Sequence, residues 1–177
     1  CDDIPNGYYI KDIESFDASF FGISSADACL IDPNHRLALE VSYEALNNAG
    51  YMKETIAGSK IGVFVGMVAP LFHSSKSIYE PQGVTGIAFS AVANRISYCL
   101  KLFGPSMTVD TACSSSLVSL SLAMQHLKLN KCKMAIVVGV NALIDCKTTI
   151  ALNSLNVLSS DGRCKTFDYR ANGYARG

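Results

Sequence analysis

The sequence contains few charges, and they are not gathered by sign. Only 17% of its residues are charged, and its 15 basic and 15 acidic residues cancel. Typical soluble domains have about a quarter of their residues charged. No basic block suits a nucleic acid, and no acidic tail is present. We therefore expect no nucleic-acid partner and attribute the low charge to large buried sheets or a buried interface.

Long apolar runs are missing as well. The longest, at about residues 134–144, is interrupted by Asn141, whereas a transmembrane helix needs about 20 apolar residues. The chain begins at Cys1 with neither an initiator methionine nor a signal peptide, and it ends at Gly177 without a change in composition. We expect a cytoplasmic protein with no transmembrane segment, cut from something longer at both ends.

The cysteines show no pairing pattern. There are seven of them, irregularly spaced and without a C-x-x-C pair, so neither a zinc ribbon nor a thioredoxin motif is indicated. Several have apolar neighbours, as Cys99 has in Tyr98 and Leu100. We interpret most of them as reduced thiols packed like small hydrophobic side chains, and we expect no metal ion.

A helix is predicted from Asp32-Pro33 to about Asn48. Aspartate at the N-cap followed by proline at the first helical position is a common helix start. Gly50 is a typical stop after the last turn. The apolar stripe of this helix is expected to contain Leu37, Val41 and Ala45.

Strand and helix patterns alternate further along the chain. Strands are expected at residues 60–68, 106–110 and 134–140, the last buried on both faces. Helical periods occupy residues 87–100 and 114–130. The stripe of the second contains Leu117, Leu120, Met124 and Leu127. Residues 69–86, rich in proline and serine, are predicted to form a surface loop. This order predicts an α/β layered fold with a mixed or parallel sheet.

Cys113 lies where a predicted strand ends and a helix begins, after the tight turn at Thr111-Ala112. The start of a helix has unpaired N–H groups and a positive dipole end, which favour a thiolate and can stabilise an oxyanion. This order is that of a nucleophile elbow. From position alone a packed core thiol stays the favoured interpretation, because free cysteine is among the most buried residue types.

Residues 109–123, VDTACSSSLVSLSLA, resemble the active-site signature of the β-ketoacyl synthases (ketosynthases) of polyketide synthases and animal-type fatty acid synthases. The same family is resembled, in chain order, by FDASFFGIS (16–24), IDPNHRLALEVSYEALNNAG (31–50), GSKIGVFVG (58–66), ANRISYCLKLFGPSMTVDTACSSS (93–116) and DGRCKTFDYRANGYARG (161–177). The resemblance covers nearly the whole chain. It identifies residues 1–177 as a partial ketosynthase domain, its N-terminal part, truncated at both ends.

The resemblance implies a fold, a reaction and partners. The fold is thiolase-like, a duplicated core of α-β-α-β-α layers of which this chain is about the first half, and the enzyme is a homodimer. Cys113 accepts an acyl chain from a phosphopantetheine thioester on an acyl carrier protein, and its backbone N–H belongs to the oxyanion hole. Decarboxylative Claisen condensation with a malonyl-type extender follows, in polyketide or fatty acid biosynthesis. No cofactor is bound directly, and the domain is expected in a multidomain synthase.

The resemblance also separates catalytic residues from structural ones. The family's two catalytic histidines and a lysine lie downstream, so the three histidines of this chain are interpreted as surface or structural residues: His35, His73 and His126. The serines after Cys113 are expected to satisfy backbone donors. Asp110 and Asp161 are interpreted as turn and cap residues, and Arg163 and Lys165 as solvated charges, although they could face the carrier protein.

Other interpretations stay open at this point. The chain could belong to a non-condensing domain that keeps only carrier binding or dimerisation, or to another acyltransferase of the thiolase fold. A cysteine hydrolase is disfavoured because no Cys–His pairing is visible. If half of a duplicated core is present, apolar helix stripes stay uncovered. We therefore expect the 177 residues alone to be inactive, and insoluble or molten.

Overall fold

The computed structural model of the chain describes residues 7–68, 81–144 and 146–177. These residues form two compact units. One comprises residues 13–140 and holds the sheet and most helices, and the other comprises the N-terminal residues up to Asp12 together with residues 141–177.

A three-stranded parallel sheet forms the centre of the larger unit. Its strands are β1 (Ile61–Gly66), β2 (Ser106–Val109) and β3 (Met134–Gly139), in the order β2-β1-β3. Val63 of β1 pairs with Ser106 on one side and with Ile136 on the other. All three strands lie where the sequence predicts them, and every residue of β1 is buried.

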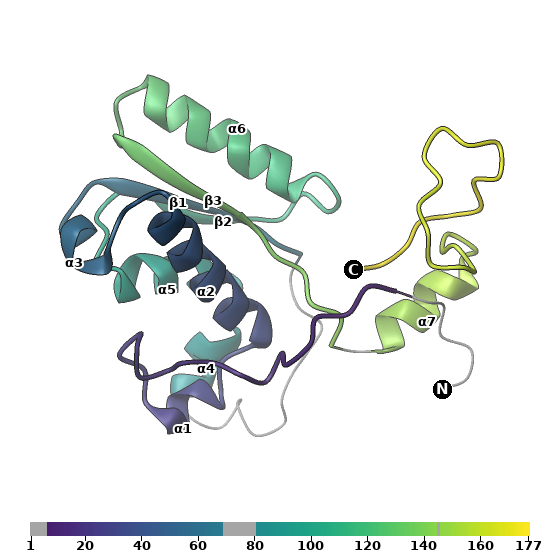
Figure 1. Cartoon of the computed structure of the whole chain (residues 1–177), viewed down its shortest axis with the longest axis horizontal. Helices are drawn as coiled ribbons and strands as arrows, with labels where there is room; N and C mark the ends of the chain where they lie inside the picture. The colour runs from purple at the N-terminus through teal and green to yellow at the C-terminus, as the bar shows by residue number, and fades with distance from the viewer. Residues whose placement is uncertain (1–6, 69–80, 145) are drawn as a thin grey trace. The chain divides into compact units, whose positions relative to one another are not determined.

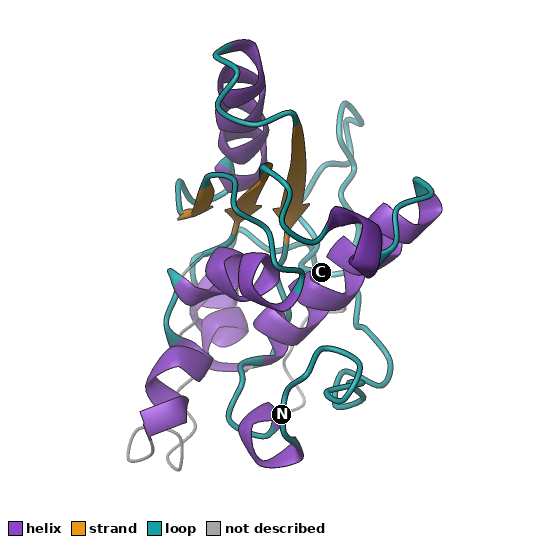
Figure 2. Ribbon diagram, turned by 90° about the vertical axis from the view of Figure 1, so that its left-hand side faces the viewer, coloured by secondary structure: helices purple, strands orange, loops and turns teal. Residues whose placement is uncertain are grey.

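Helices cover both faces of this sheet (Figures 1 and 2). The helix α6 (Ser115–Lys128) lies along one face, and α2 (Pro33–Asn48) and α5 (Ala91–Cys99) lie on the other. The core between the sheet and the layer formed by α2 and α5 contains Ala38, Leu39, Leu46, Val63, Val65, Val92 and Ile96. The predicted α/β layering is therefore confirmed.

Helix α2 begins and ends as predicted, but the face that it buries differs from the predicted one. The Asp32 carboxylate accepts from the Asn34 N–H at 2.7 Å, and Gly50 has a φ of +82° at the other end. The expected apolar stripe is wrong, because Val41 is 45% exposed. The buried face contains Asn34, His35, Ala38, Leu39, Ser42 and Leu46. Periodicity identifies the helix, whereas the sheet and α5 decide which face is covered.

The remaining helices of this unit are short. They are α1 (Ser25–Ala28), α3 (Lys53–Ile56) and α4 (Pro81–Ile87). Helix α4 lies inside the segment predicted to be a loop, so that prediction is wrong for residues 81–86; residues 69–80 lie outside the described residues. Proline is compatible with the first turn of a helix, which explains why its presence did not prevent one here.

Helix α6 presents small residues to the sheet and large apolar residues to the outside. Its buried positions are Ser115, Ser119 and Ala123. The predicted stripe is present but exposed, with Leu117 72% accessible; its other members are Leu120, Met124 and Leu127. Val137 of β3 is also exposed, so the expectation of a strand buried on both faces is wrong for this structure.

The smaller unit has one helix and a looped segment. Helix α7 (Cys146–Ser154) contains Thr149, whose hydroxyl accepts from the Arg176 guanidinium at 2.5 Å. Tyr174 and Leu158 form an isolated parallel bridge. The N-terminal segment joins this unit through the Tyr8 N–H, which donates to the Arg176 carbonyl at 2.9 Å.

The cysteines are less buried than the sequence suggests. Among the described residues, Cys99 and Cys132 are buried, whereas Cys29, Cys113, Cys146 and Cys164 are exposed. Most of these thiols are therefore not packed as small hydrophobic side chains. Within the described part of the chain, no helix combines the length and hydropathy needed to cross a membrane.

Candidate active site

Cys113 lies in the turn that joins the carboxyl end of β2 to the start of α6. Strand β2 ends at Val109, and the helix begins at Ser115 with Ser114 as its N-cap. Ala112 has a φ of +54°, a left-handed conformation that is uncommon for a non-glycine residue. The Cys113 side chain is exposed, so its sulfur is accessible to a molecule outside the chain.

The neighbours of Cys113 hold this turn together. The Asp110 carboxylate accepts from the Ala112 N–H at 3.0 Å. The Ser115 hydroxyl accepts from the Thr111 N–H at 2.9 Å and donates to the Ala112 carbonyl at 2.6 Å. These bonds agree with the interpretation of Asp110 and the serines as turn residues that satisfy backbone groups.

The first turn of α6 is not capped by its own N-cap side chain. The Ser114 hydroxyl donates to the Thr111 carbonyl at 2.8 Å and makes no side-chain cap hydrogen bond. The Ser114 and Ser115 N–H groups donate to the Thr111 and Ala112 carbonyls of the turn. The first N–H groups of an α-helix have no partner within the helix, and this end of the helix carries a partial positive charge. This end of α6 can therefore stabilise a negative oxygen that develops beside Cys113.

Two glycines let the start of α6 approach the sheet. A Cβ at Gly66, the last residue of β1, would lie 2.5 Å from the backbone of Ser115 and Ser116. A Cβ at Gly139, the last residue of β3, would clash with the Ser116 hydroxyl. Sequence reasoning missed both positions, although a glycine at the end of an apolar strand is a signal of close backbone approach.

The described histidines are not near Cys113. His126 is on α6, about 20 Å along the helix axis at 1.5 Å per residue. Its Nδ1 lies 2.8 Å from the Leu122 carbonyl, and its ring contacts Phe64. His35 is on α2, on the other face of the sheet. His73 is outside the described residues.

His35 is enclosed rather than exposed. Its side chain is 1% accessible, and neither ring nitrogen has a hydrogen-bond partner. Burial, helped by the positive charge of Arg95, lowers the pKa of His35 from 6.5 to about 3. His35 is therefore neutral at physiological pH and acts as a core residue, which supports the structural interpretation made from the sequence.

The smaller unit contains a separate polar network. Lys165 Nζ lies 2.7 Å from the Asp161 carboxylate and 2.6 Å from the Asn172 side-chain oxygen. The hydrogen bonds from Lys165 and Ser159 lower the pKa of Asp161 to about 2. Asp161 is thus a turn residue, as expected. Lys165 is not the freely solvated charge that was predicted, whereas Arg163 is exposed.

The family model for the β-ketoacyl synthase N-terminal domain matches residues 2–177. The chain belongs to the β-ketoacyl synthase family. It is 46% identical over 175 residues to the Cluster 41 polyketide synthase of Aspergillus flavus, covering 97% of this chain and 16% of that protein. It is 44% identical to probable polyketide synthase 1 of Dictyostelium discoideum, covering 96% of this chain and 6% of that protein.

Solved ketosynthase structures share the fold. The ketosynthase from module 6 of the bacillaene synthase of Bacillus subtilis 168 matches with a TM-score of 0.82 at 40% identity, over 94% of this chain and 28% of that chain. An oxazolomycin ketosynthase domain from Streptomyces albus JA3453 matches with a TM-score of 0.85 at 34% identity, over 96% of this chain and 30% of that chain. The expected thiolase-like fold is confirmed, and the chain spans less than a third of these ketosynthases.

Proposed function

We propose that the chain is the N-terminal part of a condensing ketosynthase and that Cys113 is its acyl-accepting nucleophile. The observation that supports this most directly is the position of Cys113: exposed, in a hydrogen-bonded turn, at the start of a helix whose N-cap side chain leaves the first turn uncapped. Family membership supplies the reaction class.

In the first half-reaction the Cys113 thiolate attacks the thioester carbonyl of an acyl chain on a carrier protein. The carbonyl oxygen becomes an oxyanion, which the Cys113 backbone N–H and the start of α6 stabilise. The bond from carbon to the phosphopantetheine sulfur then breaks. The products are an acyl thioester on Cys113 and the carrier's phosphopantetheine thiolate, which takes up a proton from water.

In the second half-reaction a malonyl-type thioester loses carbon dioxide, and the electron pair of the broken C–C bond forms a carbanion. The carbanion attacks the acyl carbon on Cys113, and the C–S bond breaks to regenerate the thiolate and release a β-ketoacyl thioester. Since neither described histidine lies near Cys113, we assign the decarboxylating groups to residues outside this segment.

The proposed setting is a large cytoplasmic polyketide synthase. The chain covers 16% or less of the relatives described above, which supports a multidomain protein, and both are named polyketide synthases, which favours polyketide over fatty acid synthesis. A homodimeric domain that receives substrates as phosphopantetheine thioesters on an acyl carrier protein fits this assignment. No bound cofactor is needed for either half-reaction.

Acyl loading of the complete ketosynthase domain that contains this segment tests the proposal. The domain is incubated with an acyl thioester, and intact-protein mass spectrometry measures the covalent adduct. We expect Cys113→Ala to abolish the adduct and Cys164→Ala, a second exposed cysteine, to retain it. An adduct of unchanged yield on the Cys113→Ala protein, or its loss only on Cys164→Ala, would contradict the proposal.

A further inference from the structure

Exposed lysines gather where the strands of the parallel sheet begin. Lys60 directly precedes β1 and Lys133 directly precedes β3, and the Lys133 N–H donates to the Lys60 carbonyl at 3.3 Å. The Gly58 N–H donates to the Lys101 carbonyl at 2.8 Å, which holds Lys101 at the same end. We call this surface the lysine edge; its exposed members are Lys60, Lys101, Lys128, Lys131 and Lys133.

The charge of the lysine edge is not neutralised by its surroundings. None of the five lysines forms an ion pair with another residue that the structure describes. Four of the five lysines lie between Glu80 and Asp145, where the sequence has a single acidic residue, Asp110, which follows β2 at the opposite end of the sheet. The fifth, Lys60, has Glu54 of α3 six residues before it. Like charges at neighbouring strand positions repel. The lysine edge therefore has a positive electrostatic potential, although the net charge of the whole chain is zero.

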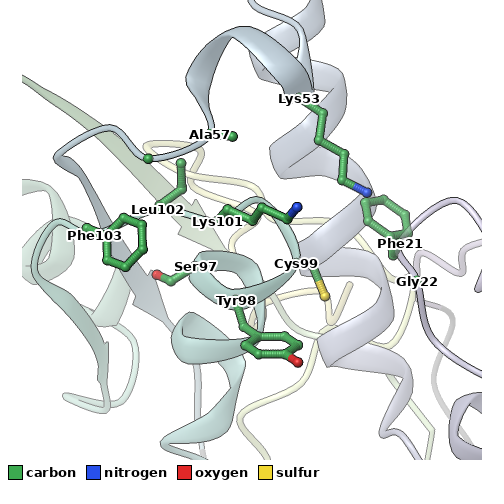
Figure 3. Close-up of a pocket in the computed structure, with 11 residues that line it drawn as sticks. Phe21, Gly22, Lys53, Ala57, Ser97, Tyr98, Cys99, Lys101, Leu102 and Phe103 are labelled. Carbon is green, nitrogen blue, oxygen red and sulfur yellow. The ribbon is translucent and has the colours of Figure 1, made fainter.

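An apolar groove lies beside the lysine edge. A cavity of about 940 Å³ is lined by residues that include Phe21, Lys53, Tyr98, Lys101, Leu102 and Phe103. Figure 3 shows Leu102 and Phe103 on one side of Lys101 and Phe21 beyond it on the other side. Tyr98 is 85% exposed and Phe103 is 73% exposed. Lys101 belongs to both the edge and the groove, so charge and apolar surface are continuous.

We propose that the lysine edge and this groove form a docking surface for an acidic polypeptide segment that has an aromatic side chain. Carboxylates of the segment meet the lysines, and its aromatic ring enters the groove. The edge contains lysines and no arginine, so it offers point charges rather than the planar forks that recognise phosphates in bidentate fashion. This chain covers 16% of one relative and 5% of another, so other polypeptide segments make up most of each of those proteins.

This surface is distinct from the entrance to the proposed active site. The lysines lie at the amino ends of β1 and β3, whereas Cys113 follows the carboxyl end of β2. A parallel strand rises about 3.3 Å per residue, so six residues separate the two ends by roughly 20 Å. The inference rests on charge and exposure, and it does not depend on the reaction proposed for Cys113.

Peptide binding to the complete ketosynthase domain tests the inference. The probe is a fluorescein-labelled 14-residue peptide of glutamates and aspartates with one central phenylalanine, and its counterpart has glutamine and asparagine instead. Fluorescence anisotropy measures the Kd at low and high salt. We expect only the acidic peptide, and not its neutral counterpart, to bind. Its affinity should fall by about tenfold or more as the salt concentration rises, because exposed charges are screened within about 10 Å at 0.1 M salt.

Charge-reversal variants locate the binding surface. We expect Lys60→Glu/Lys133→Glu to weaken binding by about tenfold or more, while Lys11→Glu/Arg163→Glu, which changes the net charge equally at exposed positions of the smaller unit, changes Kd by less than about twofold. Lys60→Gln/Lys133→Gln should give an intermediate loss of peptide affinity. It replaces the charge-reversal variant in this test if that variant does not fold. Phe103→Ser weakens binding without changing its salt dependence.

Several results would overturn the inference. Equal loss in the two charge-reversal variants would show attraction by net charge only, and equal binding of the neutral peptide would remove the role of charge. Tighter binding of single-stranded RNA or of phosphatidylserine vesicles, lost in Lys60→Glu/Lys133→Glu, would assign the surface to another class of ligand. Cys113→Ala should leave the peptide Kd unchanged, which separates this inference from the proposed function.

Discussion

Helices α2 and α6 cover opposite faces of the same sheet, and they are built in opposite ways. The buried face of α2 contains large apolar side chains such as Leu39 and Leu46, and its outer face is mostly polar. The buried face of α6 contains only serine and alanine, and its exposed side carries the apolar stripe of Leu117, Leu120, Met124 and Leu127. Helix α2 completes a core, whereas α6 lies close to the sheet and presents a second apolar surface outward.

This difference suggests what each helix is for. Small residues on α6, together with Gly66 and Gly139, let its start approach the strand ends and place Cys113. The exposed leucines match a central layer of the five-layered fold, which would be covered by the rest of the ketosynthase. Continuous apolar patches on a finished monomer are usually small.

The largest effect on acyl loading is expected from Gly66→Val. The new side chain would occupy the space of the Ser115 backbone, and overpacking of this kind costs about 1–3 kcal/mol or more. Because the start of α6 must move, acyl loading of Cys113 should fall by about a hundredfold. Urea unfolding and loading rates of the complete domain measure both effects. Unchanged loading in a folded variant would show that close approach of α6 does not position Cys113.

Leu39→Ala and Leu120→Ala compare the buried face of α2 with the outer face of α6. Leu39 is fully buried, so its truncation should cost about 2–5 kcal/mol in the free energy of unfolding. If the rest of the domain covers α6, Leu120→Ala should have a similar cost in the complete domain. Urea unfolding of both variants in the complete domain measures the two costs and shows whether Leu120 is covered. A change below about 0.5 kcal/mol for Leu120→Ala would mean that the outer face of α6 is a free surface.

The buried imidazole on α2 should make the domain sensitive to acid. The folded-state pKa of His35 is lowered to about 3, so below pH 6.5 the unfolded chain binds a proton that the folded chain does not. Stability should therefore fall as the pH drops from 6.5 towards 3, by about 2 kcal/mol at pH 5 from this group. Urea unfolding at pH 7 and pH 5 should show a weaker pH dependence for His35→Gln. Identical pH dependence in both proteins would count against a buried neutral His35.

The smallest effect is expected for Ser119 of α6. Its hydroxyl is buried and has no hydrogen-bond partner. Replacing it with alanine removes an unsatisfied polar group, so Ser119→Ala should stabilise the domain by up to about 1 kcal/mol. Ser115→Ala, which removes hydrogen bonds of the Cys113 turn, should destabilise it by a similar amount. Thermal unfolding measures the Tm of both variants. A shift of Tm in the same direction for both would contradict the assignment of Ser119 as an unsatisfied hydroxyl and Ser115 as a hydrogen-bonded one.

Local features of this chain were predictable from the sequence, and tertiary ones were not. Asp32-Pro33, Gly50 and the apolar strands determine where elements begin and end, and the residues around Cys113 identify the proposed nucleophile. The faces that α2 and α6 bury were not predictable, because they depend on which surface meets the sheet. Helix α4 was missed, and the sequence left open whether His35 is a surface or a structural residue, for the same reason: neighbouring segments override local composition.

The turn around Cys113 has a consequence for the covalent cycle proposed above. Asp110, Thr111, Ser114 and Ser115 make the side-chain hydrogen bonds of this turn, and the Cys113 sulfur makes none of those observed. Under the proposed function, the thiol would change between free and acylated forms while the surrounding backbone keeps its shape. The groups proposed to stabilise the oxyanion would then need no rebuilding at each turnover, and acyl chains of different length would meet the same electrostatic environment.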